Sequence, residues 1–116
     1  METQQVAEEF TALCKAGQFE EAGERFWADD VISLEAAEGP MQRTDGRAAV
    51  KAKGDWWTEN HEVHAFTTEG PMVNGDQFML RFHVDVTPNG DTRRQMDEIG
   101  LYTVRDGRIV EERFFY

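Results

Sequence analysis

The chain has 116 residues, a length typical of one domain, so we expect a single domain over residues 1–116. Hydrophobic residues make up 40% of the chain and aromatic residues 11%, which supplies the apolar surface for one packed core. The formal net charge of -11 would repel nucleic acid and anionic membranes, so we exclude both as partners.

The single cysteine and the polar start of the chain indicate the cellular compartment. Cys14 has no second cysteine to pair with, which excludes an intramolecular disulfide and a thiolate metal site of the CxxC kind. Residues 1–5 lack the basic start and apolar run of a signal peptide, and no apolar segment is long enough to cross a bilayer. We therefore expect a cytoplasmic protein.

Two helices are predicted at the start of the chain. Each carries one apolar stripe at helical spacing, and Gly17 is suited to end the first helix in a left-handed conformation. The second helix begins near Phe19, with acidic residues in its first turn. The expected inward residues are Val6, Phe10, Leu13 and Cys14 in the first helix and Phe19, Ala22 and Phe26 in the second, with Trp27 at the end of the second helix as a further candidate.

A short strand and a third helix follow. Apolar and β-branched residues predict a strand over 31–35, and glycine and proline predict a loop over 36–46. Asp45 is the expected N-cap of a helix over about residues 46–60. Its apolar positions are less cleanly spaced than those of the first helix, so its facing stays open.

The second half of the chain predicts an antiparallel sheet. Three turn signals, Asn74-Gly75-Asp76, Pro88-Asn89-Gly90-Asp91 and Asp106-Gly107, separate segments of alternating hydrophobicity. Strands this long favour a strongly curved sheet, with Gly70 and Gly100 as expected bend or bulge positions. The predicted strands cover residues 62–73, 77–87, 92–105 and 108–116.

The alternation shows which side chains face the core in one of these strands and leaves two choices in each of the last two strands. Phe78, Leu80, Phe82, Val84 and Val86 alternate with polar residues and are expected to face the core. The last two strands carry apolar residues in both phases, although composition favours Val110, Glu112, Phe114 and Tyr116 as the inward set of the final strand. A second copy of the chain covering the outer sheet face would explain the doubled pattern, so we expect a homodimer.

The order of these elements and several segments resemble the SnoaL-like family of the nuclear transport factor two superfamily. The matching segments are FTAL (10–13), FEEA (19–22), WADDV (27–31), GRAAV (46–50) and YTVRDGRIVEERFFY (102–116). The resemblance covers nearly the whole chain and implies an α+β fold in which a curved antiparallel sheet wraps around two to three N-terminal helices as a cone. It does not fix a reaction, because the superfamily includes isomerases, polyketide cyclases, hydrolases, dehydratases and proteins without catalysis.

Ketosteroid isomerase, a relative, tests one reaction directly. Its chemistry needs a carboxylate base opposite a tyrosine and a protonated aspartic acid. The resemblance places Glu35 at the base, but Phe10 and Gly100 fall where the other two groups would be. A steroid isomerase of that design is therefore not expected.

The resemblance also implies which side chains of the last two strands point into the cone, and acidic residues are among them. Glu98 and Glu112, joined by Glu35, would raise one another's pKa through burial and repulsion, which lets a neutral acid and an ionised base coexist near pH 7. The alternative is that these glutamates pair with Arg, Trp or Tyr donors or reach solvent. His64 alternates in phase with Phe66 and is a further candidate for proton transfer, against the alternative of a hydrogen-bonded structural histidine.

Two hypotheses of function remain open. The first is a cofactor-independent protein that holds a small hydrophobic molecule in the cone and performs isomerisation, cyclisation or hydration, with Glu98, Glu112, Glu35 and His64 as catalytic candidates. The second is a non-catalytic ligand-binding or dimerisation module. No metal site is expected, since His61 and His64 lack a helix that carries both. The expected ligand-binding residues are Trp57, Phe82, Tyr102, Phe114 and Tyr116.

Overall fold

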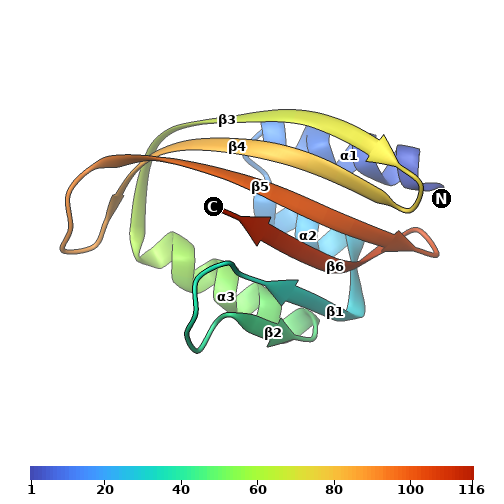
Figure 1. Ribbon diagram of the computed structural model, residues 1–116, viewed down its shortest axis with the longest axis horizontal. Coiled ribbons are helices and arrows are strands. Elements are labelled where there is room, and N and C mark those ends of the chain that lie inside the picture. Colours follow the sequence, from blue (N-terminus) through green and yellow to red (C-terminus); the bar gives the residue numbers. More distant parts are fainter.

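Three helices and six strands make up the computed structural model, which describes all residues 1–116 (Figure 1). The predicted α+β fold with a curved sheet is confirmed. In chain order the elements are α1 (Thr3–Lys15), α2 (Phe19–Phe26), β1 (Trp27–Leu34), β2 (Arg43–Asp45), α3 (Arg47–Glu59), β3 (His61–Asn74), β4 (Gln77–Pro88), β5 (Arg94–Arg105) and β6 (Arg108–Phe115). None of the three helices is long and apolar enough to span a membrane.

The strands form a single sheet in the order β2-β1-β6-β5-β4-β3. All neighbouring pairs are antiparallel except β1 and β6, which run parallel. The long strands β3, β4 and β5 arch across the molecule with α1 and α2 behind them, and α3 lies beside β1 and β2 (Figure 1). The concave side of the sheet and the three helices together enclose the core.

The core contains the residues that the hydrophobic periodicity predicted for α1 and β4. Val6, Phe10 and Cys14 are buried on α1, and Gly17 adopts a positive φ of 77° just after this helix. On β4 the inner residues Phe78, Leu80, Phe82 and Val86 are buried. Phe19 is an exception: it is 43% exposed, because it opens α2 at the edge of the core, where its ring packs edge-on against Phe66 and Phe82.

Several boundaries differ from the prediction. β1 begins at Trp27, four residues before the expected strand, and β2 lies inside the expected loop. Asp45 does not cap α3, because its carboxylate binds the Arg43 guanidinium, and Gly46 occupies the cap position with a φ of 91°.

Register shifts interrupt the strand pairing of the sheet at several places. The β3–β4 register shifts between Glu69 and Met72, so the predicted irregularity at Gly70 is confirmed. Gly100, by contrast, pairs regularly with Leu80 and is not a bulge. A shift in β6 leaves Val110 without a partner on β5, so Ile109, rather than Val110, is buried.

Candidate functional site

Glu112, on the inner face of β6, is the most deeply buried carboxylate of the chain, with 5% of its surface exposed. The indole N–H of Trp27 donates a hydrogen bond to its Oε1 at 2.8 Å. The Ser33 hydroxyl donates to its Oε2, also at 2.8 Å. Both carboxylate oxygens are therefore occupied by donors from β1.

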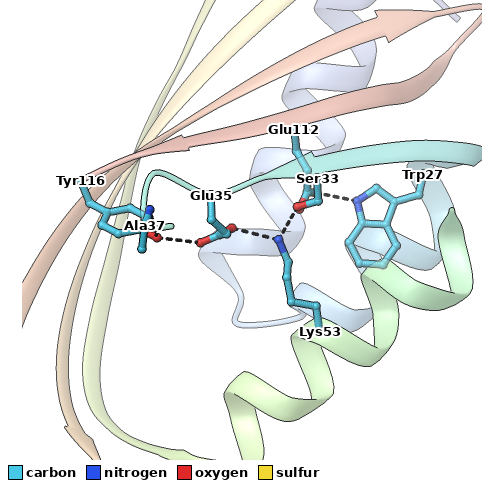
Figure 2. Close-up of polar contacts among 7 residues, drawn as sticks. All are labelled: Trp27, Ser33, Glu35, Ala37, Lys53, Glu112 and Tyr116. Carbon is cyan, nitrogen blue, oxygen red and sulfur yellow. Dashed lines mark hydrogen bonds and ion pairs between the residues drawn. The ribbon is translucent and has the colours of Figure 1, made fainter. Parts of the chain in front are cut away.

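Lys53 extends this network to a second carboxylate (Figure 2). Its ammonium donates to Ser33 Oγ and, at 2.9 Å, to Glu35 Oε2. The Tyr116 hydroxyl donates to Glu35 Oε1 at 3.2 Å and accepts a hydrogen bond from the backbone N–H of Ala37 at 3.1 Å. A continuous chain of polar contacts thus runs from Trp27 to the loop after β1.

Sheet pairing explains why these groups meet. The parallel pairing of β1 and β6 places Ser33 directly beside Glu112. Ser33 near the end of β1 and Glu35 just after the strand lie on the same side, and both polar side chains point toward α3 (Figure 2). α3 then supplies Lys53, whose side chain is only 13% exposed.

Glu98 differs from the other two carboxylates in having no hydrogen-bond or ion-pair partner. It lies half-buried on the inner face of β5, directly across from Phe82 on β4. Burial, together with the nearby charges of Glu35 and Glu112, raises its pKa from 4.5 to about 7, although the Lys53 ammonium opposes the shift. Near neutral pH both protonation states of Glu98 are populated.

Glu112 is held in a different way. Burial raises its pKa, while the donors Ser33 and Trp27 and the Lys53 charge act in the opposite direction. The Trp27 indole can only donate, so Oε1 must accept. The net effect is a raised pKa, and the two donors hold the carboxyl of Glu112 in place on the inner wall.

Tyr102 completes the inner wall between these carboxylates. It is 3% exposed, and its ring stacks on Phe78 at a centroid distance of 4.9 Å. Gly100, two residues before it, leaves the space in which the phenol lies, since a Cβ at that glycine would come 2.8 Å from the hydroxyl oxygen.

The three predicted carboxylates are therefore brought together. Of the aromatic candidates, Phe114 and Phe82 lie on the inner wall and Trp57 lies elsewhere. Phe114 packs beside Tyr102 at 6.3 Å, with the Lys53 ammonium 5.5 Å from its ring centroid. Phe82 is 8% exposed and part of the core. Trp57 instead stacks on His61 at 4.2 Å, at the end of α3.

The structure does not bring His64 to this cluster. Its side chain is exposed and hydrogen-bonds to Thr87 Oγ1 at 2.8 Å. The expectation that it points inward is wrong, because the β3–β4 register shifts between Val63 and Ala65 and breaks the alternation with Phe66.

The sequence prediction missed three residues of the site: Trp27, Ser33 and Lys53. Trp27 was assigned to a helix end, whereas it opens β1. Ser33 could have been found, since it alternates with Val31 and Glu35 in the strand. Lys53 carried no such signal, because its position depends on how α3 packs against β1.

Two surface hollows lie outside the cone. One, of about 360 Å³, lies beside Met1 and the β5–β6 turn. The other, of about 510 Å³, is open to solvent between α3 and the β2 region, and Lys53 forms part of its wall. Its lining residues are Pro40, Met41, Arg43, Thr44, Asp45, Ala49, Ala52 and Lys53.

Comparison with known proteins places this arrangement in a family. The profile of the SnoaL-like domain matches residues 1–116. The chain belongs to the SnoaL-like family. No curated protein matches it.

Solved structures show the same fold. A candidate SnoaL-like polyketide cyclase from Mesorhizobium loti is 53% identical, with 100% of both chains covered and a TM-score of 0.98; its name also carries the words carbohydrate phosphatase. A candidate isomerase from Bacillus subtilis is 19% identical over 98% of this chain and 88% of that one, with a TM-score of 0.76. An NTF2-like protein from Burkholderia xenovorans is 19% identical over 97% and 87%, with a TM-score of 0.75.

Proposed function

We propose that this SnoaL-like protein holds a small hydrophobic molecule inside the cone and moves a proton on it without a cofactor. The proposed reaction class is isomerisation, cyclisation or hydration. The names of two similar proteins, a candidate polyketide cyclase and a candidate isomerase, fall in this class. The observation that carries the proposal is Glu98, a half-buried carboxyl without a partner.

Glu98 has the properties of a general acid or base. A catalytic group works best when its pKa lies near the working pH, and that of Glu98 is raised to about 7. No donor has to be displaced before its carboxyl can contact a ligand. Glu112 and Glu35 are already engaged by Ser33, Trp27, Lys53 and Tyr116, so we assign them the role of setting the charge around Glu98.

The surroundings of Glu98 favour an apolar ligand. Phe82 faces it across the strand pair, and the Phe114 ring lies on the neighbouring strand of the same inner wall. Aromatic rings beside a neutral carboxylic acid would accept a flat organic molecule more readily than a charged one.

Hydrogen exchange on a simple ketone tests this function. The probe is 2-tetralone in D₂O, whose hydrogens beside the carbonyl exchange when a base removes them, as followed by NMR. We expect the protein to accelerate this exchange and Glu98→Gln to lower the acceleration by about a hundredfold or more, since acid–base groups contribute about 10²- to 10⁴-fold. The control is Asp97→Asn, the preceding residue on β5, which is exposed and points to the other face. Equal exchange by the protein and by buffer would contradict the proposal.

A non-catalytic module is the second candidate. It is favoured by the aromatic packing of Phe10, Phe78 and Tyr102 inside the cone and by the position of both hollows outside it. Under this alternative, 2-tetralone binds without faster exchange, or does not bind at all, and Glu98→Gln changes neither result.

A further inference from the structure

Gly23 lies in the interior of α2, a position where glycine is unfavourable. Alanine would stabilise the helix there, because glycine loses more backbone freedom on folding. The backbone of Gly23 is helical rather than left-handed, and the residue is buried. Neither a turn nor contact with solvent therefore explains why position 23 has no side chain.

The indole of Trp27 occupies the space that a side chain would need. A Cβ at position 23 would lie 2.5 Å from Cη2 and Cζ3 of this indole and 2.7 Å from Cζ2. Carbon atoms that are not bonded to each other pack at about 3.5 to 4.0 Å. Alanine at position 23 would therefore displace the outer ring of the indole by about 1 Å or more.

The backbone of Trp27 is held in place on three sides. Its N–H donates to the carbonyl of Gly23, and Arg47 Nη1 donates to its carbonyl at 3.4 Å. The residue also pairs with Ile109 on β6. The indole can therefore yield mainly by turning about its side-chain bonds, which moves its N–H away from Glu112.

This N–H is one of the two donors that hold the Glu112 carboxyl. It donates to Oε1 at 2.8 Å, while the Ser33 hydroxyl donates to Oε2 (Figure 2). An indole has a single N–H, which lies in the plane of the ring, so the direction of the hydrogen bond follows the ring. The space at Gly23 thus determines where the indole lies, and the indole helps to determine where Glu112 presents its carboxyl.

We propose that Gly23 is a positioning residue of the acidic site, because it leaves the space from which the Trp27 indole holds Glu112. The link to catalysis rests on the proposed function, in which Glu112 sets the charge around Glu98. The contact between Gly23, Trp27 and Glu112 does not depend on any reaction.

Loss of the indole contact should change the charge of the inner wall in a defined direction. The hydrogen bond from Trp27 lowers the pKa of Glu112, so without it the carboxyl keeps its proton to higher pH. The Glu112 charge in turn raises the pKa of Glu98. With Glu112 neutral over a wider pH range, Glu98 should ionise at lower pH. The other ionisable groups around Glu112, which stay unchanged, are Glu35 after β1, Lys53 on α3, Tyr102 on β5 and Cys14 on α1.

The test combines Gly23→Ala with Trp27→Phe, which removes both the N–H and the outer ring of the indole. We expect Gly23→Ala alone to shift the NMR resonance of the Trp27 indole N–H, to raise the pKa of Glu112 and to lower the urea midpoint. Carbon-13 NMR of the glutamate carboxyl groups follows the pKa. In the Trp27→Phe chain, adding Gly23→Ala should change neither the Glu112 titration nor lower the urea midpoint, because the atoms that it would meet are absent.

Gly54→Ala is the matched control. Gly54 is also a glycine in a helix interior, on α3, but a Cβ there would meet nothing within 4 Å. We expect this variant to raise the urea midpoint and to leave the indole resonance and the Glu112 titration unchanged. A glycine needed only for packing would change the urea midpoint without changing the pKa of Glu112.

The outcomes for the contact do not depend on activity. An unchanged indole resonance and Glu112 pKa in Gly23→Ala would overturn the positioning role, as would an equal effect of Gly23→Ala with and without Trp27→Phe. If Gly23→Ala fails to fold while the double variant folds, the contact is supported. If the double variant also fails to fold, the proposed cause is wrong.

The pH profile of 2-tetralone exchange tests the link to the proposed function. We expect the profile of Gly23→Ala to move to lower pH, in step with the raised pKa of Glu112. If the pKa of Glu112 rises and the exchange profile stays in place, the link from Glu112 to Glu98 is overturned. If the pKa rises but the unmodified protein accelerates no exchange, the positioning role of Gly23 stands and the proposed function is overturned.

Discussion

Glu98 holds its proton more tightly in the folded chain than it would in an unfolded one. Its pKa is raised from 4.5 to about 7 by burial and by the neighbouring carboxylates. Below pH 4.5 the group is neutral in both states and has no effect on the pH dependence. Between pH 4.5 and 7 the unfolded chain loses this proton first, so the stability of the fold decreases as the pH rises.

This linkage predicts a pH-dependent effect of Glu98→Gln. The neutral amide cannot ionise, so we expect the variant to be more stable than the unmodified chain at pH 8. Its free energy of unfolding should be higher by about 2 to 3 kcal/mol at pH 8 and nearly the same at pH 4. Urea unfolding at the two pH values measures the difference. Glu59→Gln, an exposed position at the end of α3, is the matched control. A gain of the same size at both pH values would show that the effect comes from packing rather than from charge.

The residues of the site could be predicted from the sequence to different extents. The inward facing of Glu98 and Glu112 follows from alternation once the phase of each strand is known, and the family resemblance supplied that phase. What the sequence could not supply is which carboxylate is free. That depends on Trp27, Ser33 and Lys53, which lie far away in the chain and reach the site only through tertiary contacts.

At the scale of elements, the site depends on the parallel pairing of β1 with β6 and on α3 crossing above it. The pairing joins Ser33 to Glu112, and α3 adds Lys53, the cation that contacts this network of carboxylates. Because three carboxylates share one ammonium, the position of α3 determines how much negative charge the cone interior retains.

Lys53→Met, on α3, should therefore change the pKa of Glu98 on β5. Without the ammonium, the pKa of Glu98 should rise further above 7, because Lys53 acts to lower it. The variant should also lose about 1 to 3 kcal/mol of stability, since Ser33 and Glu35 lose a buried donor. Carbon-13 NMR of the glutamate carboxyl groups follows the first effect, and urea unfolding follows the second.

Lys51→Met provides the comparison for this variant. Lys51 lies two residues earlier on α3, and its ammonium contacts only the exposed Glu20 and Asp55. Exposed ion pairs add little to stability. We expect neither the Glu98 titration nor the unfolding midpoint to move, and an equal response of both lysine variants would contradict a specific role for Lys53.

The limits of the element prediction have physical causes. Turn residues predicted β3 to β6 to within a few residues because Asn-Gly and Asp-Gly fix tight hairpins locally. β2 was missed because a strand of three residues has too few positions to show alternation. Ile109 was missed as a buried residue because the bulge beside it is created by pairing with β5, which the sequence of β6 alone does not reveal.

At the scale of the whole molecule, the sheet has a second apolar surface on the side away from the helices. An outer apolar row crosses four strands through the neighbouring pairs Met72–Met79, Met79–Leu101 and Ile99–Phe115. Met72 is 68% exposed and Phe115 is 47% exposed. Arg81 and Arg113 flank the row, and Glu69 lies beside Arg81, so the surface offers both charges at its rim.

We propose that a second copy of the chain covers this row. A self-complementary surface with an apolar centre and a rim of both charges fits an isologous dimer, because each charge can meet its opposite on the partner. We expect light scattering at micromolar concentration to give twice the mass of one chain, and Leu101→Arg, at the centre of the row, to give a monomer.

Ala48→Arg, on the exposed side of α3, adds the same charge elsewhere and should leave the dimer intact. The acidic cluster lies on the opposite face of the sheet from the row, so a monomeric Leu101→Arg variant should retain the Glu98-dependent exchange of 2-tetralone. A single-chain mass for the unmodified protein would contradict the dimer. Loss of exchange together with the dimer would instead mean that sheet curvature, and with it the approach of β5 to α3, depends on the second copy.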